Sequence, residues 1–250
     1  MKIIIQNLAT EYKDEGKGPI ILLLHGWGDN LHTFDNIVLE LTEKNRVITI
    51  DLPGFGETET PESAWNLDNY INFVKEFIEK LDIKPKILIG HSFGGRIILK
   101  SIANNTLSAE KLILISSAGV EKRNTLRKSL LKVIAKIGKV LTFIPPLLFF
   151  RDKLKGKFYN KIGSDYITAG ELRETFLKVI REDLSSSAVK INKPTLLLWG
   201  EKDTVTPLSD GETLNKLISN SKLEVIKNTG HFPHKEKPQE VIELINDFIN

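Results

Sequence analysis

Short and almost uninterrupted apolar runs recur along this chain of 250 residues, and they constrain its fold more than any other feature. The clearest occupy positions 20–24, 87–89, 112–115 and 196–199. Strands of a parallel sheet are buried on both faces, so they are apolar at consecutive positions instead of alternate ones. The runs therefore predict a mostly parallel β-sheet with helices on both faces.

Amphipathic helical stretches separate the apolar runs, which is typical of the α/β class. The opening segment 2–12 is expected to be a strand or a hairpin. Further strands are predicted at 20–25, 46–51, 86–90, 111–115, 195–199 and 223–227, and helices at 33–44, 66–81, from Phe93 onward and at 235–249. The result would be a sheet of about eight strands flanked by helices.

The motif Gly90-His91-Ser92-Phe93-Gly94 stands directly after one apolar run and before an expected helix. A strand-to-helix turn this sharp brings backbones too close for a Cβ atom, so glycine is needed on both sides of the serine. Such a turn leaves the Ser92 hydroxyl exposed at its tip, where it can attack a carbonyl group. The alternative for a glycine-rich segment after a strand is an ordinary turn.

Polar residues also follow three other expected strands. His25, Asp203 and His231 each lie just past the carboxyl end of a strand. In an open parallel sheet these ends share one edge, and ligands bind in the crevice beside it. We therefore expect the three side chains to converge on Ser92.

The chain order Ser92, Asp203, His231, together with the loop His25-Gly26-Trp27-Gly28, resembles the α/β-hydrolase superfamily in the branch whose nucleophile is serine. The resemblance covers nearly all of the chain outside residues 119–189. It implies the α/β-hydrolase fold and a catalytic triad of Ser92, Asp203 and His231.

The chemistry of these residue types agrees with the implied roles. A serine hydroxyl is a poor nucleophile until a neighbouring base takes its proton, and a histidine such as His231, with an ordinary pKa of about 6.5, can do so near neutral pH. Asp203 would orient the imidazole and stabilise its cation. Glu201 is the competing carboxylate, but Asp203 is preferred because W-G-x-x-D resembles the acid loop of the superfamily.

The resemblance also implies an oxyanion hole. Trp27, in the H-G-x-G loop, and Phe93, directly after the nucleophile, would each donate a backbone N–H to the oxyanion of a tetrahedral intermediate. The Trp27 indole would then be either a pocket wall or a core residue.

The other histidines are not expected to transfer protons. His25 and His91 are interpreted as residues that orient the loops of their motifs, and His32 and His234 as residues of the surface or the pocket rim. No group of ligands has the spacing of a metal site, so we expect neither a metal nor another cofactor.

Residues 119–189 separate two expected strands and are too many for a plain connection. We expect a helical cap there, with a core domain made of 1–118 and 190–250. The first part of the expected cap, 126–144, has apolar residues on one face and lysines on the other. A lid over the active site is the favoured interpretation, and contact with a membrane surface is the alternative. Charged residues interrupt every long apolar window, which argues against a transmembrane span.

Composition narrows the function further. The chain has no cysteine, which excludes a disulfide framework, a thiolate metal site and a cysteine nucleophile. The net charge of +3 conceals a basic segment, because residues 119–161 carry twelve Lys or Arg and two Asp or Glu. This segment is either a solvated helix face or a surface that attracts anions, and no motif for nucleic acid accompanies it. The amino terminus lacks an apolar signal region, so we expect a cytoplasmic enzyme.

The resemblance implies acyl chemistry, because the similar dehalogenases and epoxide hydrolases attack with aspartate. The favoured function is a serine hydrolase that cleaves carboxylic esters of small to medium size through an acyl-enzyme. A carbon–carbon bond hydrolase of vinylogous diketones and a cofactor-free haloperoxidase or perhydrolase are the alternatives, and a non-catalytic binding protein is a third. The expected partner is a small-molecule ester or ketone, while the acyl chain length and the oligomeric state stay open.

Overall fold

The structure is a computed structural model, and it describes residues 1–120 and 170–250. The strands are β1 (Lys2–Ile5), β2 (Leu8–Gly16), β3 (Ile20–Leu24), β4 (Arg46–Ile50), β5 (Ile87–His91), β6 (Lys111–Ile115), β7 (Thr195–Gly200) and β8 (Ser221–Ile226). The helices are α1 (Asp35–Leu41), α2 (Leu67–Lys80), α3 (Phe93–Ala103), α7 (Arg173–Ile180), α8 (Ser185–Ala188), α9 (Leu208–Leu217), α10 (Pro233–Glu236) and α11 (Pro238–Ile249), with the 3-10 turns η1 (Leu31–Phe34) and η3 (Gly170–Leu172).

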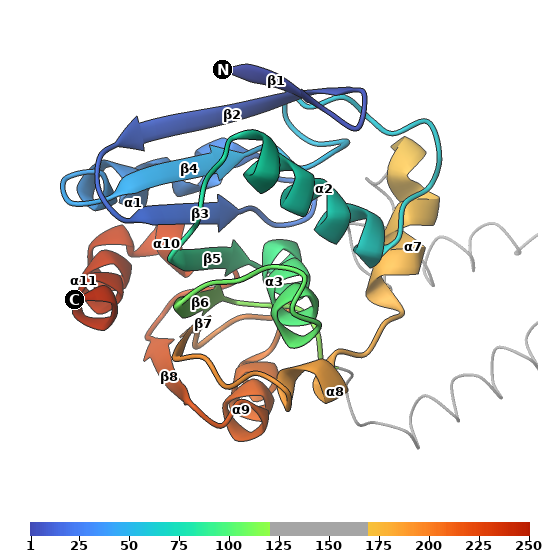
Figure 1. Cartoon of the computed structure of the whole chain (residues 1–250). Coiled ribbons are helices and arrows are strands. Elements are labelled where there is room, and N and C mark those ends of the chain that lie inside the picture. The colour runs from blue at the N-terminus through green and yellow to red at the C-terminus, as the bar shows by residue number, and fades with distance from the viewer. Residues whose placement is uncertain (121–169) are drawn as a thin grey trace, which may run out of the picture.

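The strands form one sheet in the order β1-β2-β4-β3-β5-β6-β7-β8. Strands β1 and β2 pair antiparallel, as do β2 and β4, and the pairs from β4 through β8 are parallel. The prediction of a mostly parallel sheet of about eight strands flanked by helices is therefore confirmed. The arrowheads of β3, β4 and β5 point toward α7, so that α7 lies at the carboxyl edge of the sheet (Figure 1).

The opening segment is a hairpin. Its two turn residues, Gln6 and Asn7, have φ angles of 49° and 63°. Positive φ at both central residues defines the type I′ turn that matches the twist of a hairpin, and Asn adopts such angles more easily than most residues. The hairpin adds the antiparallel edge to a sheet that is otherwise parallel.

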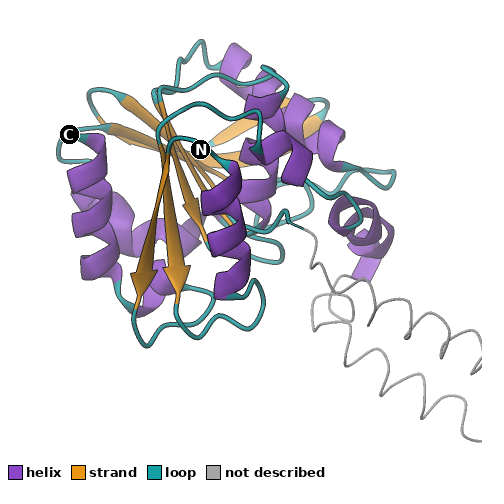
Figure 2. Cartoon of the chain, turned by 90° about the horizontal axis from the view of Figure 1, so that it is seen from below, coloured by secondary structure: helices purple, strands orange, loops and turns teal. Residues whose placement is uncertain are grey.

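The sheet is buried on both faces, and this explains its continuous apolar runs. Leu22 and Leu88 pack in the core with α2 and α3, whereas the neighbouring Ile21 and Ile87 pack in the core with α1 and α11. Successive side chains of a strand point to opposite faces, so every position needs an apolar residue. Figure 2 shows the twisted sheet between its two layers of helices.

The closing helix differs from the prediction, because it is two helices instead of one over 235–249. Helix α10 ends at Glu236 and α11 begins at Pro238. Lys237 between them has φ −140° and ψ 64°, outside the helical region. Proline hinders the α conformation of the residue before it and lacks an N–H, so the chain restarts its helix there.

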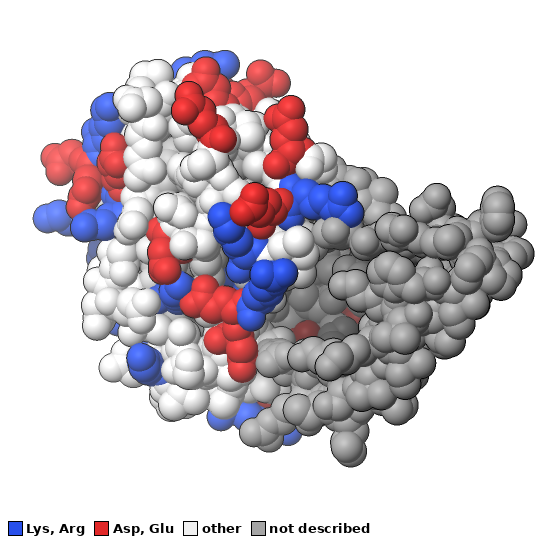
Figure 3. Space-filling view, turned by 90° about the vertical axis from the view of Figure 1, so that its right-hand side faces the viewer, with Lys and Arg blue, Asp and Glu red and all other residues white. Residues whose placement is uncertain are grey.

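The described surface mixes both signs of charge. On the face in Figure 3, several acidic side chains gather at the top, and acidic and basic side chains lie next to one another over the middle. The predicted basic helix and most of the predicted cap fall on residues 121–169, outside the described ranges. The end of the cap segment, 170–189, contains α7 and α8. In residues 1–120 and 170–250, no helix combines the length and the apolar character that a bilayer crossing requires.

Candidate active site

Ser92 occupies a strained turn between β5 and α3. Its φ of 47° and ψ of −103° lie outside the favoured regions for an L-residue. Hydrogen bonds hold this backbone, because the Ser92 N–H donates to the carbonyl of Ile115 at 3.0 Å and the Ser92 carbonyl accepts from Ala118 at 3.1 Å. Strain of this kind persists only where the surroundings fix it, and it is concentrated at functional sites.

The two glycines that flank the turn have no room for a side chain. A Cβ at Gly90 would lie 2.7 Å from the backbone of Gly94 and Gly95, and one at Gly94 would lie 2.0 Å from the carbonyl oxygen of Leu24. Strand β5 and helix α3 could not approach this closely with any other residue. The glycines of the motif therefore place Ser92 at the tip, as the sequence predicts.

The loop that contains Gly26 and Trp27 lies against the same turn. A Cβ at Gly26 would be 2.7 Å from Nδ1 of His91 and 3.4 Å from Cβ of Ser92. The N–H of Gly94 also donates to the carbonyl of His25 at 3.0 Å. The loop 25–28 and the turn 90–94 are thus brought together, although about sixty residues separate them in the sequence.

His231 and Asp203 form a close pair at this edge of the sheet. Nδ1 of His231 lies 2.8 Å from Oδ2 of Asp203, and the side chains are 10% and 0% exposed. Oδ1 of Asp203 accepts hydrogen bonds from the backbone of Val205 at 2.8 Å and of Thr206 at 2.9 Å. Glu201, the competing carboxylate, is exposed and accepts from the backbone of Asn228 instead. The preference for Asp203 over Glu201 agrees with this arrangement.

The Asp203 carboxylate is stabilised in its charged form. Burial alone would raise its pKa, but hydrogen bonds from His231 and Thr206 and the charge of His231 outweigh burial and lower the pKa below the usual 3.8. An ionised Asp203 accepts a hydrogen bond from the Nδ1–H of His231, which leaves Nε2 of that ring as the nitrogen with a free lone pair.

Thr206 is a member of this site that sequence reasoning did not identify. Its hydroxyl donates to Oδ2 of Asp203 at 2.9 Å, lies 3.2 Å from Nδ1 of His231 and lies 3.0 Å from the carbonyl oxygen of Ser116. A signal was present in the spacing Asp203-x-x-Thr206, because an Asp side chain often accepts hydrogen bonds from the backbone N–H groups that follow it, which here brings Thr206 beside the carboxylate.

The strands bring Ser92 and His231 to neighbouring positions. The ring of His91, next to Ser92, lies 4.8 Å from the ring of His231, centroid to centroid. Within the described ranges the Ser92 hydroxyl makes no hydrogen bond to His231. Catalytic hydrogen bonds are often long before substrate binds and shorten in the complex.

The backbone amides of Trp27 and Phe93 are available as donors. Phe93 is the first residue of α3, where an N–H has no partner within its own helix. Neither amide donates a hydrogen bond to any part of the chain that the structure describes. Among the described residues, neither N–H group has an acceptor, as the oxyanion role expected from the sequence requires.

Three aromatic rings surround the Trp27 indole and form with it an aromatic wall that the sequence analysis did not predict. Trp27 lies 4.9 Å from the ring of Phe55, 5.5 Å from Phe93 and 5.0 Å from Phe176 on α7. The indole is half-buried. Of the two interpretations that the sequence left open, the half-buried position between core and α7 favours a pocket wall.

His25 and His91 orient loops, as predicted. Nε2 of His25 accepts from the backbone of Leu52 at 2.9 Å, and Nδ1 donates to the carbonyl of Gly26 at 2.7 Å. Nε2 of His91 donates to the carbonyl of His231 at 2.9 Å. Burial lowers the pKa of both rings, so each is neutral.

The prediction for His234 was wrong, because it is fully buried instead of lying on the surface or the pocket rim. Its Nε2 lies 3.1 Å from the hydroxyl of Thr33, and its ring lies 4.7 Å from that of His91. The short helix α10 turns this side chain inward beneath the His231 loop, which a local sequence pattern does not reveal. His32 is exposed, as predicted, and pairs with Asp35 at 2.8 Å. Among the described residues no group of three or more His, Asp or Glu is placed to hold a metal ion.

The match to known proteins agrees with this geometry. Residues 21–244 match the Alpha/beta hydrolase family. The chain belongs to this family. Proteins with the alpha/beta hydrolase fold catalyse many different reactions, so membership of the family establishes the fold but does not identify the substrate.

Three similar proteins show the range of this alpha/beta hydrolase family. Human monoacylglycerol lipase ABHD6 is 26% identical over 94% of this chain and 76% of its own length. The crystal structure of a membrane phospholipase A, described as a bacterial virulence factor, matches with a TM-score of 0.78 and 25% identity over 100% of this chain and 84% of that one. The meta-cleavage product hydrolase CumD matches with a TM-score of 0.76 and 23% identity over 100% and 97%. The similarity to CumD shows only that the two proteins share a fold.

Proposed function

We propose that this alpha/beta hydrolase cleaves carboxylic esters of small to medium size, with Ser92 as nucleophile, His231 as general base and Asp203 as the orienting acid. The observation that carries the proposal is the 2.8 Å contact between His231 and Asp203 beside the strained turn of Ser92. The similarity to a monoacylglycerol lipase and to a phospholipase A supports ester substrates.

In the first step, Oγ of Ser92 attacks the ester carbonyl carbon while Nε2 of His231 takes the hydroxyl proton. The carbonyl oxygen becomes an oxyanion that accepts hydrogen bonds from the backbone N–H groups of Trp27 and Phe93. Donors that are fixed before the reaction stabilise this charge without a cost of reorganisation. The intermediate then expels the alcohol, which receives its proton from His231.

In the second step, water attacks the acyl-enzyme and gives its proton to Nε2 of His231. The second tetrahedral intermediate releases the acid and returns the proton to Ser92. Asp203 keeps the same contact with Nδ1 of His231 throughout, where it stabilises each imidazolium. No cofactor takes part in either step.

The aromatic wall offers an apolar surface for the acyl or alcohol part of the ester. Phe176 of α7 belongs to the segment 119–189, which we propose to be a cap over the site. Its contact with Trp27 supports this position, because Trp27 also carries a proposed oxyanion donor. Substrate contacts from the cap would then set the preferred chain length.

The experiment is hydrolysis of p-nitrophenyl esters from acetate to laurate by the native protein and by Ser92→Ala. We expect turnover that falls by about 10⁴-fold or more in the variant, because the nucleophile is lost while binding is retained. Ser186→Ala, which changes an exposed serine of α8, is the matched control and should keep full activity. Unchanged turnover in Ser92→Ala would contradict the mechanism.

Carbon–carbon bond cleavage of a vinylogous diketone is the second candidate, since CumD has this fold. The same triad would serve it, so the distinction needs a substrate test. A dienoate diketone of the meta-cleavage type is assayed beside the esters. Cleavage of the diketone together with no ester turnover would replace the ester proposal by this one.

A further inference from the structure

A groove of about 540 Å³ lies at the edge of the sheet opposite to Ser92. Its walls are the second half of α2, the segment 83–86 before β5, the segment 106–110 before β6, and Lys193 before β7. Strand β5 has five residues, so the groove is separated from Ser92 by about 17 Å of strand. It is a site apart from the proposed active site.

The floor of the groove is apolar. Ile83, Leu107 and Ala109 are 5%, 6% and 4% exposed and belong to the hydrophobic core, and the half-buried Ile78 packs against that core. Pockets of several hundred Å³ with an apolar lining and a few polar groups are typical of sites for small molecules. The floor therefore suits the hydrocarbon part of a ligand.

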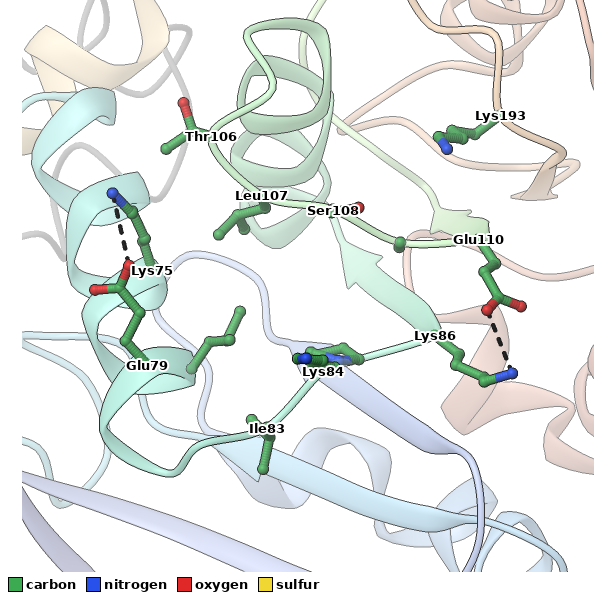
Figure 4. Close-up of a pocket in the computed structure, with 13 residues that line it drawn as sticks. Lys75, Glu79, Ile83, Lys84, Lys86, Thr106, Leu107, Ser108, Glu110 and Lys193 are labelled. Atoms are coloured by element: carbon green, nitrogen blue, oxygen red, sulfur yellow. Dashed lines mark ion pairs between the residues drawn. The ribbon is translucent and has the colours of Figure 1, made fainter.

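Four lysines and two glutamates surround this floor (Figure 4). Two of the lysines are paired with carboxylates. Lys75 lies 3.6 Å from Glu79, and Lys86 lies 3.3 Å from Glu110. Both pairs are largely exposed, and such pairs hold their partners only weakly.

The other two lysines, Lys84 and Lys193, have no carboxylate partner among the described residues. Figure 4 shows Lys84 near the centre of the view and Lys193 on the other side of the segment 106–110, which carries Ser108. Lys193 is half-buried. Two lysines that pair with no carboxylate in 1–120 or 170–250 therefore stand beside an apolar floor.

We propose that this groove binds an amphiphilic carboxylate, a molecule with one anionic head and an unbranched hydrocarbon chain. The head lies between the ammonium groups of Lys84 and Lys193, and the chain lies on Ile83, Leu107 and Ala109. The positive charges of the two lysines complement an anionic head. The apolar floor suits a hydrocarbon chain, whereas a simple inorganic anion would leave this floor uncovered. The proposal is independent of the proposed ester hydrolysis.

The test is a titration of the whole protein after reductive methylation with ¹³C-formaldehyde, which labels each lysine and keeps its charge. The signals of Lys84 and Lys193 are assigned with Lys84→Arg and Lys193→Arg. The ligands are hexanoate, octanoate and decanoate below their micelle concentrations. We expect saturable shifts of these two signals, with a dissociation constant that falls by up to about fourfold for each added methylene group.

Three controls define the result. The signal of Lys222, an exposed residue of β8 that pairs with Glu224, should not shift saturably. Decyltrimethylammonium, with a similar chain and a cationic head, should not bind. The double variant Lys84→Glu and Lys193→Glu should abolish the saturable shift of the neighbouring Lys86, whereas Lys222→Glu should leave it unchanged.

Two outcomes would overturn the proposal. If none of the three carboxylates shifts the signals of Lys84 and Lys193 saturably, the groove is not a binding site. Acetate or inorganic phosphate binding as tightly as decanoate would mean that the lysines attract any anion and that the apolar floor plays no part. Because the signals report each lysine separately, binding of a carboxylate in the catalytic site does not affect either conclusion.

Discussion

Nε2 of His91 donates a hydrogen bond to the backbone carbonyl oxygen of His231 across 2.9 Å. His91 is buried, and burial, together with the charges of His234 and His231, lowers its pKa well below 6.5. The neutral ring carries its single proton on Nε2, because only an N–H can face the carbonyl. Nδ1 of His91 has no partner in the described structure. The residue before the proposed nucleophile thus anchors the loop of the proposed base.

We expect His91→Phe to lower kcat for the best ester by about fivefold, since the loss of one hydrogen bond is worth about 1 kcal/mol and loosens His231. KM should change less, because His91 does not face the substrate. The comparison variant His32→Gln alters an exposed histidine and should keep the native kcat. A native kcat in His91→Phe would show that the His231 loop does not depend on this bond.

Thr206→Val tests the hydroxyl that contacts both Asp203 and His231. The variant keeps the shape of the side chain but removes the hydroxyl donor, which lies 2.9 Å from Oδ2 of the buried Asp203 and 3.0 Å from the carbonyl oxygen of Ser116. We expect the free energy of unfolding to fall by about 1–3 kcal/mol and kcat to fall with it. Urea unfolding and ester kinetics measure the two effects. Thr206→Ser retains the hydroxyl and should keep most of the native unfolding free energy and kcat. If Thr206→Ser is as impaired as Thr206→Val, the effect comes from packing and not from the hydroxyl.

The buried His234 makes the stability depend on pH. Burial lowers its pKa to about 3, while in the unfolded chain it titrates near 6.5. Between these values only the unfolded state binds the proton. Stability is therefore full above pH 6.5 and decreases as the pH falls, by at most about 1.4 kcal/mol per pH unit for this one group. His25 and His91, whose pKa values are also lowered by burial, act in the same direction.

Urea unfolding at pH 7, 6 and 5 measures this dependence. His234→Gln should reduce the slope of stability against pH by about one proton, whereas His32→Gln, at an exposed site, should leave it unchanged. A native slope in His234→Gln would mean that other groups account for the acid sensitivity.

Arg96 on α3 secures the segment after α7. Its buried guanidinium donates through Nη2 to the backbone carbonyls of Val179, at 2.8 Å, and of Glu182. Burial lowers its pKa to about 10, and the nearby Glu182 and Asp183 oppose that shift. We expect Arg96→Met to destabilise the protein by about 2–3 kcal/mol, because two carbonyls lose a charged donor.

The comparison for Arg96 is Arg46→Met, which removes an arginine bound through two nitrogens to Asp14 at the surface. That pair is partly exposed and should contribute about 1 kcal/mol or less. Urea unfolding ranks the two variants, and hydrogen exchange should show faster exchange over 173–184 in Arg96→Met alone. If the two variants lose the same free energy of unfolding, the burial of Arg96 does not make its hydrogen bonds worth more than those of the partly exposed Arg46.

The sequence was informative wherever a local pattern has one physical cause. Continuous apolar runs such as 20–24 predicted parallel strands, because burial on both faces demands them. The glycines at 90 and 94 predicted the sharp turn at Ser92, because only glycine fits there. The break between α10 and α11 was missed although Pro238 was visible, since proline is also common in the first turn of a helix.

The sequence by itself thus determined the family, the sheet with its helices, and the candidate residues Ser92, Asp203 and His231, because strand patterns and the residues at strand ends are local. Only the tertiary structure decided that Thr206 contacts His231, that His234 is buried behind the pair of Asp203 and His231, and that lysines from three segments meet at one groove. Those relationships join positions far apart in the chain. They depend on how the sheet and helices pack, and no local pattern of residues encodes them.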